Sequence, residues 1–387
     1  MTDGATWVDE ALREHERETR SAAGRKAATG PEREQQVLDR IDKARRRRPK
    51  VREERITMAH GAGGKASESL VRGLFLPAFA SAALEALGDA GVIEIEGLAL
   101  ALTTDSFVVR PLRFPGGSIG ELAVNGTVND LAVSGARPLA LTLSLVLEEG
   151  LAAQALRAEV EAMARAAAGA GVTIVAGDTK VVERGHADGM YICTTGLGRL
   201  DGRARLSPNA LRPGDRILVS GRIGEHGTAI MLARGEFELD AAIRSDTCSL
   251  WPAVDALLES AGPQLRCLRD ATRGGVATVL NELARASGVT VVVDEARIPV
   301  HPAVAGACEL LGIDPMYVAN EGKLVAVVAP EAAPAALAAL RALPGCEEAQ
   351  EIGAVHREPP GMVLVNTAFG GRRVMDMLVG DPLPRIC

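Results

Sequence analysis

Two carboxylates in this chain follow short apolar runs, in positions that suit metal and phosphate chemistry. Asp105 follows the run at 98–102, and Asp178 follows the run at 172–175, with Lys180 two residues later. Both runs are predicted strands, and ligand sites in α/β sheets form where strands end. We therefore expect both aspartates just past a strand end. A turn-forming aspartate is the ordinary alternative for each.

A predicted helix at 119–134 carries its polar residues at intervals of four. Glu121, Asn125 and Asn129 share one face of this helix, and Asp130 lies beside them. The rest of the segment is mostly Leu, Ala and Val, so these polar residues either face solvent or line a cleft. With the two strand-end aspartates, Asp130 would complete a set of hard oxygen ligands of the kind that Mg²⁺ takes beside substrate phosphates.

A glycine-rich loop opens the folded part of the chain. It spans 59–65 and places Gly61, Gly63 and Gly64 before Lys65. Closely spaced glycines let the backbone approach a ligand, and the lysine adds a cation suited to phosphate. The spacing is not that of a Walker loop, and a plain turn is the alternative.

Two loops in the second half of the chain carry further candidates. At 269–275, Arg273 and two glycines precede a predicted helix, which makes an anion site with Thr272 as the N-cap. At 319–323, Glu321 lies between two apolar stretches. The residue types there favour a hairpin turn, and a loop that presents Glu321 is the alternative.

The chain ends on a cysteine, Cys387, in a proline-containing segment. Pro382 and Pro384 cannot continue a helix or donate to a sheet ladder, so they favour an extended strip. A thiol at the tip of such a strip can enter a deep site and leave it. A frayed end without function is the alternative.

Composition narrows the class of protein. The 387 residues are 47% hydrophobic with 42 glycines and 20 prolines, which is enough for two domains with apolar cores. An aromatic content of 3% weighs against base stacking on nucleic acid, and a net charge of −7 weighs against a general polyanion-binding surface. The six cysteines are dispersed and lack zinc spacing, which fits a reducing cytoplasm. We find no signal peptide and no apolar run of membrane length, so we expect no membrane partner.

Residues 1–55 differ in charge from the rest of the chain. They hold 15 Lys/Arg and 12 Asp/Glu, a net charge of +3, which leaves −10 for residues 56–387. The mixed charge, the few large apolar residues and the four arginines at 45–48 predict an extension that is partly helical or disordered. The folded part then divides near 203–213, where polar residues and prolines precede a predicted strand at 216–220.

Seven segments, dispersed over the folded part, together resemble one family. They are HGAGGK at 60–65, TTDSFVV at 103–109, FPGGSIGELAVNGTVNDLAVSGA at 114–136, GDTKVVERG at 177–185, RDATRGG at 269–275, ANEGK at 319–323 and LPRIC at 383–387. These segments are similar to those of the HypE family of hydrogenase maturation factors, within the superfamily of aminoimidazole ribonucleotide synthetase and selenophosphate synthetase. Superfamily relatives share the carboxylate and glycine motifs, whereas the terminal Pro-Arg-Ile-Cys marks this family.

The resemblance implies a two-domain PurM-like fold of the α+β class, with mixed α/β content. Residues 56–205 would form an N-terminal ATP-binding domain, whose sheet joins that of a second copy in a dimeric β-barrel. Residues 206–375 would form a C-terminal α/β domain, and residues 376–387 a mobile tail that ends in the carrier cysteine. The protein would act in the cytoplasm as a homodimer.

The implied activity is an ATP-dependent dehydration with Mg²⁺. The carbamoyltransferase HypF would place a carbamoyl group on the sulfur of Cys387, and loss of water would leave a thiocyanate. The HypC–HypD complex would receive the cyanide for the iron of a nickel–iron hydrogenase. Lys180 would neutralise phosphoryl charge or move a proton, and Glu321 is the first choice of base, with Glu282 second.

The resemblance also implies the residues that hold ATP and metal. The metal ligands would be Asp105, Asp130 and Asp178. The ATP contacts would be Gly63, Gly64, Lys65, Asp105, Asn125, Asn129, Asp130, Asp178, Thr179 and Arg273. Relatives often have a cysteine at the position of Asn125, so this chain argues against an obligatory second thiol there.

Two other classes of function remain open from the sequence. One is another ATP-using superfamily enzyme, such as a selenophosphate synthetase or a thiamine monophosphate kinase. Selenophosphate synthetases carry a reactive cysteine or selenocysteine in the first glycine loop, whereas residues 58–65 contain none. The other class is a non-catalytic scaffold that uses the tail only to dock maturation partners, and it predicts no ATP consumption once the tail is carbamoylated.

Overall fold

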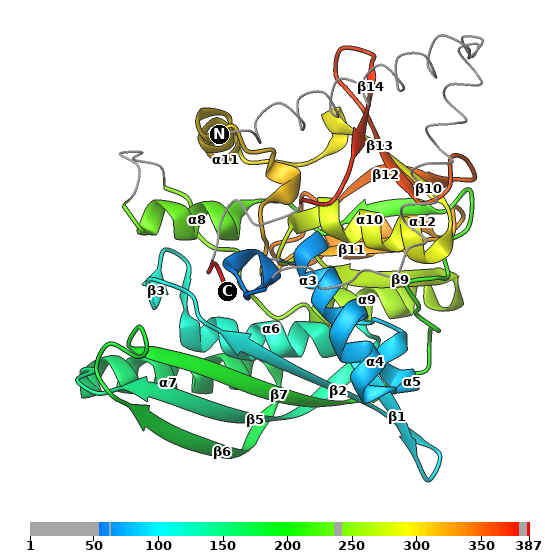
Figure 1. Ribbon diagram of the computed structural model, residues 1–387. Helices are drawn as coiled ribbons and strands as arrows, with labels where there is room; N and C mark the ends of the chain where they lie inside the picture. Colours follow the sequence, from blue (N-terminus) through cyan, green and yellow to red (C-terminus); the bar gives the residue numbers. More distant parts are fainter. Residues whose placement is uncertain (1–53, 62, 236–241, 379–384) are drawn as a thin grey trace, which may run out of the picture. The chain divides into compact units, whose positions relative to one another are not determined.

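The structure is a computed structural model that describes residues 54–61, 63–235, 242–378 and 385–387 (Figure 1). Within these residues the chain forms two large β-sheets, of five and seven strands, each packed against helices, and a small two-stranded sheet. Most of the predicted extension at 1–55 and the prolines Pro382 and Pro384 lie outside the described residues.

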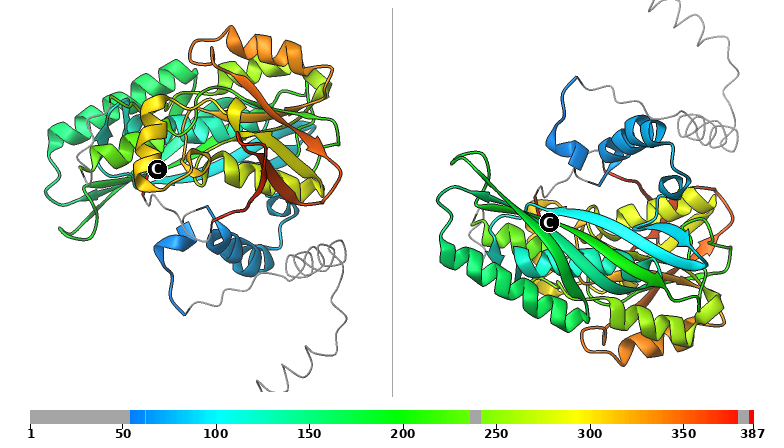
Figure 2. Two further views of the ribbon diagram at one scale, coloured as in Figure 1. Left: turned by 90° about the horizontal axis from the view of Figure 1, so that it is seen from above. Right: turned by 90° about the horizontal axis from the view of Figure 1, so that it is seen from below.

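The five-stranded sheet lies in the first half of the chain (Figure 1). Its strands, in spatial order, are β1 (Gly91–Ile95), β2 (Leu98–Phe107), β7 (Met190–Leu200), β5 (Ala136–Glu148) and β6 (Thr173–Val182). Only β5 and β6 run parallel. The helices α6 (Ile119–Val133) and α7 (Ala153–Ala170) pack on one face, and Figure 2 (right) looks onto the other face. A two-stranded hairpin of β3 (Arg113–Phe114) and β4 (Gly117–Ser118) leads into α6.

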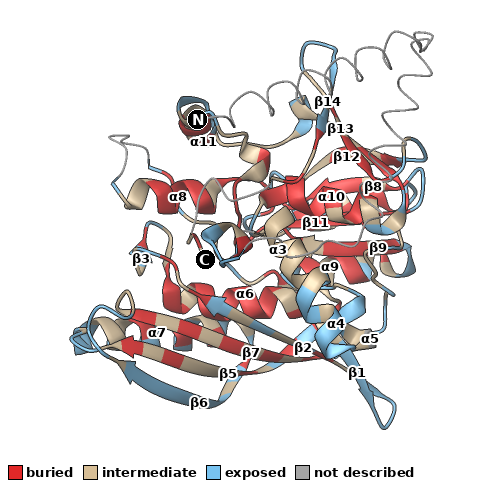
Figure 3. Ribbon diagram, viewed as in Figure 1, coloured by how far each residue is buried: buried red, intermediate tan, exposed pale blue. Residues whose placement is uncertain are grey.

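Helix α6 is the element that joins the two halves of the molecule. It starts at Ser118, whose side chain accepts a hydrogen bond from the N–H of Glu121. Nearly all of its residues are buried, because it packs against β2, β5 and β7 on one side and against α9 (Trp251–Ser260) and β9 (Leu265–Asp270) on the other (Figure 3). The helix is therefore held between two layers, and its polar residues are enclosed along with its apolar ones.

The seven-stranded sheet belongs to the second half of the chain. Its order is β14 (Arg372–Met375), β13 (Met362–Asn366), β10 (Thr290–Asp294), β12 (Gln350–His356), β8 (Arg216–Val219), β11 (Leu324–Val328) and β9. Ile217 and Val219 pack with α10 (Gly275–Ser287) on one face, while Leu218 packs with α9 and α12 (Ala333–Arg341) on the other. Because side chains alternate along a strand, a sheet covered on both faces needs the continuous apolar runs seen in β8 and β11.

Shorter helices complete the described chain. The first set packs near the start of the folded part and comprises η1 (Met58–Gly61), α3 (Lys65–Leu70), η2 (Val71–Phe75), α4 (Leu76–Phe79) and α5 (Ala82–Glu85). The second set comprises α8 (Glu225–Ala233), η3 (Gly262–Gln264), η4 (Glu295–Arg297), α11 (Pro302–Leu311) and η5 (Pro315–Tyr317). Of the helices that the structure describes, none has both the length and the apolar character to cross a bilayer.

The two aspartates that we expected past strand ends lie inside strands, so that prediction was wrong. Strand β2 continues to Phe107, with Asp105 paired to Thr194, and β6 continues to Val182, with Asp178 paired to Ser144. Whether a strand continues through polar residues depends on the neighbouring strands that pair with it, and the sequence of one strand does not show those partners.

Two local predictions in the second half were also wrong. Helix α10 has Gly274 as its N-cap, in the left-handed conformation, and Thr272 does not cap it. Residues 319–323 do not form a hairpin, because a 3₁₀ turn rather than a strand precedes them. The alternative, a loop that presents Glu321, is the one observed. The predicted domain bounds at 205 and 375 stay predictions, although the first sheet ends at Leu200.

Candidate functional site

Three aspartates from distant parts of the chain meet between the two sheets. Asp89 precedes β1, Asp130 lies in α6, and Asp270 ends β9. Each offers a carboxylate oxygen, and these oxygens all lie within 4.8 Å of one another. Thr103 on β2 lies beside them, because its hydroxyl oxygen is 2.7 Å from Asp130 Oδ2 and 2.9 Å from the Asp89 carbonyl oxygen. The three aspartates are hereafter called the acidic cluster.

The charge state of the acidic cluster points to a cation. Burial raises the pKa of Asp89 to about 6 and that of Asp270 to about 8; nearby carboxylates such as Asp105 add to both shifts, and the Arg269 guanidinium opposes both. Burial also raises the pKa of Asp130 well above its ordinary value and raises the pKa of Asp105. Buried carboxylates this close are stable as anions only when a positive charge joins them. The donor set, all carboxylate oxygens, fits Mg²⁺.

The predicted metal set overlaps only partly with the acidic cluster. Asp105 interacts directly with Asp130 and accepts a hydrogen bond from Thr127 at 3.3 Å, so the structure brings these two predicted ligands together. Asp178 is not with them. It lies on the edge strand β6, three strand spacings or about 14 Å from β2.

Asp178, Thr179 and Lys180 are exposed on β6 (Figure 3). The ammonium group of Lys180 lies 2.8 Å from Asp178 Oδ2, and both side chains are more than 60% exposed. This hydrogen bond from Lys180 lowers the pKa of Asp178, the opposite of what happens in the acidic cluster. Within one chain these residues are apart from the buried carboxylates.

Sequence reasoning missed two members of the acidic cluster. Asp270 lies inside the RDATRGG segment, where we had singled out only the threonine and the second arginine. Asp89 lies in the short loop between α5 and β1, before a strand rather than after one, so the search for carboxylates at strand ends did not mark it.

The glycine loop lies against the 269–275 loop. Gly63 has φ +76, and a Cβ there would lie 3.0 Å from the Cβ of Arg273, so the close approach requires glycine. Arg273 in turn donates to the Gly61 carbonyl at 2.8 Å. Lys65 begins α3 and pairs with Asp376 at 2.7 Å. The predicted phosphate loop and the predicted anion site are thus neighbours.

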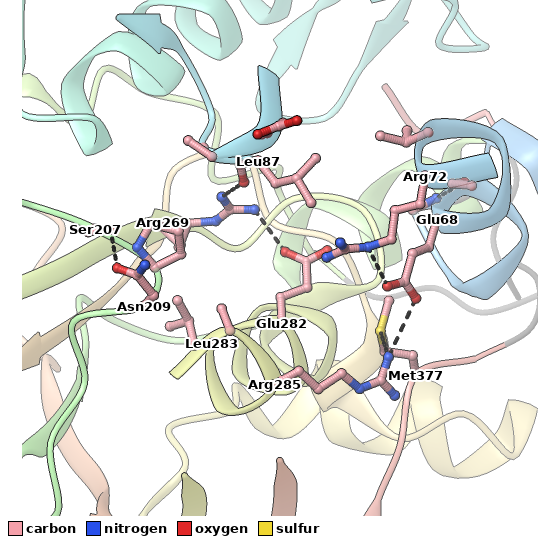
Figure 4. A pocket seen from close by; sticks show the side chains of 18 of the residues that line it. Glu68, Arg72, Leu87, Ser207, Asn209, Arg269, Glu282, Leu283, Arg285 and Met377 are labelled. Atoms are coloured by element: carbon pink, nitrogen blue, oxygen red, sulfur yellow. Dashed lines mark hydrogen bonds and ion pairs between the residues drawn. The ribbon is translucent and has the colours of Figure 1, made fainter. Parts of the chain in front are cut away.

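A cavity of about 500 Å³ opens beside this loop and contains both acidic and basic side chains (Figure 4). Gly63, Gly64 and Leu87 line it together with Arg269 and Glu282. Arg269 Nη2 lies 2.8 Å from Glu282, while its Nη1 lies 3.1 Å from Asp89. Arg269 therefore links the cavity wall directly to the acidic cluster.

Glu321 is almost fully buried, with 3% of its surface exposed. Its N–H donates to Asp246 Oδ1 at 3.0 Å, and its carbonyl accepts from Asn129 Nδ2 at 3.1 Å. A Cβ built on Gly126 would lie 3.9 Å from Glu321 Oε2 and 2.9 Å from the ring of Phe107, so the carboxyl lies near the end of β2. Burial raises the pKa of Glu321 well above its ordinary value, and Asp270 adds to the shift.

The two asparagines predicted to contact ATP hold protein groups. Asn125 Nδ2 lies 3.3 Å from the hydroxyl of Thr247. Asn129 donates to the Cys248 carbonyl at 3.0 Å and accepts from the N–H of Leu250 at 2.7 Å. Their face of α6 packs against the segment at 245–250, and their contact with ATP stays a prediction.

The chain end is docked against the body of the protein. Ile386 is 1% exposed and packs in an apolar cluster that includes Phe107. A terminal carboxylate oxygen of Cys387 accepts from the N–H of Val108 at 3.0 Å, and the carbonyl of Ile386 lies 2.7 Å from His226 Nε2. The terminal cysteine therefore lies at the same strand end as the Glu321 carboxyl.

Arg385, which precedes Ile386 and Cys387, is held through both its backbone and its side chain. Arg234 donates to the Arg385 carbonyl at 2.6 Å, while the Arg385 guanidinium pairs with Asp188 at 2.5 Å. With these contacts, a backbone oxygen of each of the last three residues has a donor from the body of the protein.

Comparison with known proteins places the chain in a family. Residues 87–200 match the AIR synthase related protein N-terminal domain, and residues 212–365 match the C-terminal domain. Carbamoyl dehydratase HypE of Rhizobium leguminosarum bv. viciae is 48% identical over 350 residues, 90% of this chain and 100% of that protein. A crystal structure of a HypE–HypF complex is similar with TM-score 0.76 and 44% identity, over 80% of this chain and 99% of that chain.

A crystal structure of HypE in complex with ATP is similar with TM-score 0.72 and 45% identity, over 86% of this chain and 100% of that chain. With nearly half of its residues identical along the full length of a relative and both domain models matched, this chain belongs to the HypE family, which confirms the resemblance drawn from its motifs.

Proposed function

We propose that this chain is an ATP-dependent carbamoyl dehydratase that turns an S-carbamoyl group on Cys387 into a thiocyanate. The observation that carries the proposal is the docked chain end, which brings the terminal cysteine to the strand end where Glu321 is buried. HypF would load the carbamoyl group, and the HypC–HypD complex would receive the cyanide for the iron of a nickel–iron hydrogenase. Five of its cysteines, Cys193, Cys248, Cys267, Cys308 and Cys346, are free thiols, which supports a cytoplasmic location.

The chemistry explains the need for ATP. The amide oxygen is a poor leaving group, so it must first accept the γ-phosphoryl group and then leave as phosphate. The nitrogen loses two protons as the C≡N bond forms. When bound, Mg²⁺ would neutralise charge on the phosphates, and Asp89, Asp130 and Asp270 would hold it, with Asp105 adjacent.

The 500 Å³ cavity is the proposed site for the nucleoside part of ATP. It is bordered by the glycine loop and by Arg269, which also contacts Asp89 in the acidic cluster. The triphosphate would run from the cavity past Arg269, while Gly63, Gly64 and Arg273 supply close backbone and a cation. Lys65 would exchange its pairing with Asp376 for a phosphate.

Glu321 remains the proposed base for the amide protons. Its raised pKa makes the ionised carboxylate a stronger base than an exposed glutamate. Glu282, the second choice, lines the cavity and is paired with Arg269, which leaves it less suited to accept a proton at the chain end.

The proposed homodimer rests on the uncovered face of the five-stranded sheet (Figure 2). Ile93, Ile95, Leu98 and Leu102 are each 38% or more exposed there, and the register places Ile93 opposite Leu100 and Ile95 opposite Leu98 on that face. A continuous apolar surface of this kind marks an interface. The proposed roles of Asp178, Thr179 and Lys180 in ATP binding and proton transfer rest on such a dimer, because in one chain these residues lie apart from the acidic cluster.

One experiment tests the proposal. The purified protein is incubated with HypF, carbamoyl phosphate and ATP, and the mass of the C-terminal peptide is then measured by mass spectrometry. We expect a carbamoyl adduct that loses one water only when ATP is present. Cys387→Ala should remove both masses, and Glu321→Gln should keep the adduct but slow the loss of water. Loss of water without ATP, or equal turnover of a free carbamoyl-thiol by a variant lacking the tail, would refute the proposal.

A further inference from the structure

A segment without regular secondary structure at 245–250, hereafter the strap, lies between α6 and the Glu321 loop. The N–H of Ser245 donates to the Pro115 carbonyl at 2.7 Å, which anchors the start of the strap to the turn before α6. Asn129 holds its end, at Cys248 and Leu250. No motif in the sequence drew attention to this segment.

The strap touches backbone on both sides. A Cβ on Gly322 would lie 1.9 Å from the Asp246 carbonyl oxygen, and a Cβ on Gly116 would lie 2.5 Å from the Ser245 nitrogen. Real Cβ contacts are never this short, so both neighbours must be glycine for the strap to fit. Such backbone contact leaves the strap little room to shift.

Asp246 reaches the residue that we propose as the base. Its Oδ1 accepts the N–H of Glu321 at 3.0 Å, and its Oδ2 lies 3.5 Å from the ammonium group of Lys323. The Asp246 side chain is 1% exposed and that of Lys323 is 9% exposed. Because Asn129 binds the carbonyl of Glu321, the peptide groups on both sides of this residue are held.

The preceding strap residue reaches the chain end. The hydroxyl of Ser245 lies 2.8 Å from His226 Nδ1, and His226 Nε2 lies 2.7 Å from the Ile386 carbonyl. A carbonyl only accepts, so Nε2 carries the hydrogen and Nδ1 accepts from Ser245. Burial lowers the pKa of His226, which fits this neutral ring.

Two adjacent strap residues therefore hold the two partners of the reaction. We propose that Asp246, neutralised by Lys323, is a positioning residue for Glu321, and that Ser245 and Asp246 together set the spacing between the Glu321 carboxylate and the docked tail. This inference rests on the proposed function. It assigns a role to Lys323, the one charged residue of the 319–323 segment that the proposed reaction did not use.

A single-turnover assay tests the role of Asp246. Protein carbamoylated by HypF is mixed with ATP and Mg²⁺, and loss of water from the C-terminal peptide is followed by mass. Asp246→Ala should slow this step by about 100-fold, because small misplacements of a reacting group have effects of this size. ATP affinity and the rate of carbamoylation by HypF should stay at wild-type values, which a general loss of structure would not allow.

A conservative rescue guards against misfolding. Asp246→Asn combined with Lys323→Met keeps an oxygen acceptor for the Glu321 N–H and removes the buried ammonium that would otherwise lack a partner. This double variant should recover most of the rate. Asp294→Ala is the matched control, since Asp294 also accepts a backbone N–H, that of Ala296 at 3.2 Å, on the surface away from the site.

A double-mutant cycle with Glu321 tests whether Asp246 acts by positioning Glu321 or acts independently of it. In a Glu321→Gln background, adding Asp246→Ala should slow dehydration by less than about 3-fold, because the residue it positions is already disabled. Full multiplication of the two effects, or a rate for Asp246→Ala equal to that of Asp294→Ala, overturns the proposal. A wild-type rate for Glu321→Gln alone overturns the assignment of the base itself, so the two failures are distinguishable.

Discussion

Replacing Ile386 by alanine is expected to release the docked tail while leaving the body folded. Ile386 is 1% exposed and packs with Phe107 and Val304 in the apolar cluster. The change removes three carbon groups, and at about 0.8 kcal/mol per group the docked state loses about 2.4 kcal/mol. That corresponds to a rise of up to about 50-fold in the ratio of undocked to docked tails.

Alkylation of the terminal thiol measures this equilibrium. The protein is treated with iodoacetamide, and modification of Cys387 is followed in the C-terminal peptide, which separates it from the other cysteines. When undocking is fast, the rate rises with the undocked population. Leu310→Ala is the control, since it removes the same number of carbons at a site that is 71% exposed on α11. An alkylation rate for Ile386→Ala within twofold of wild type would refute a tail held by apolar packing.

Three further predictions concern the acidic cluster, the glycine loop and the sheet face. In the presence of a metal chelator, the free energy of unfolding measured with urea should be roughly 3 kcal/mol higher for Asp89→Asn than for wild type above pH 7. Near pH 4 the two free energies should be equal. The sign follows because the raised folded-state pKa of about 6 makes wild type lose stability as pH rises from about 4 through 6, whereas an amide does not titrate; parallel curves would contradict it. Gly63→Ala should weaken ATP binding in calorimetry by roughly 5-fold or more, because φ is +76 there, whereas Gly61→Ala, with open space around its added Cβ, should bind normally. Ile93→Glu should give a monomeric mass in light scattering and Leu310→Glu, at a site 71% exposed on α11, should not; equal masses would argue against the proposed interface.

Periodicity predicted the elements whose pattern is long and apolar. The helix expected at 119–134 is α6 at Ile119–Val133, and the strand expected at 216–220 is β8 at Arg216–Val219. In both, burial of a continuous apolar surface decides the structure, and that surface is visible in the chain itself. The motifs likewise indicated the HypE family from the sequence alone, because dispersed glycine and carboxylate segments with a terminal cysteine occur together in that family.

Other features depend on contacts that no local pattern records. Whether Asp105 lies in a strand or beyond it depends on its ladder partner in β7, and polar residues such as Thr103 and Thr104 are compatible with both. Asp89 became a member of the acidic cluster only because its loop lies beside α6 and β9. Asp246 is a similar case, since its partners Glu321 and Lys323 are more than 70 residues away.

The sequence by itself determined the family, the apolar elements and the types of residue available for chemistry. Tertiary structure alone decided which carboxylates share a site, because the largely buried acidic cluster forms between residues that are far apart in the chain and close in space. It also decided that Asp178 and Lys180 lie on an exposed edge strand, since strand order follows from pairing across the whole sheet. The sequence specifies which residue types are present, whereas the packing of the two sheets and their helices decides which of these residues are close in space.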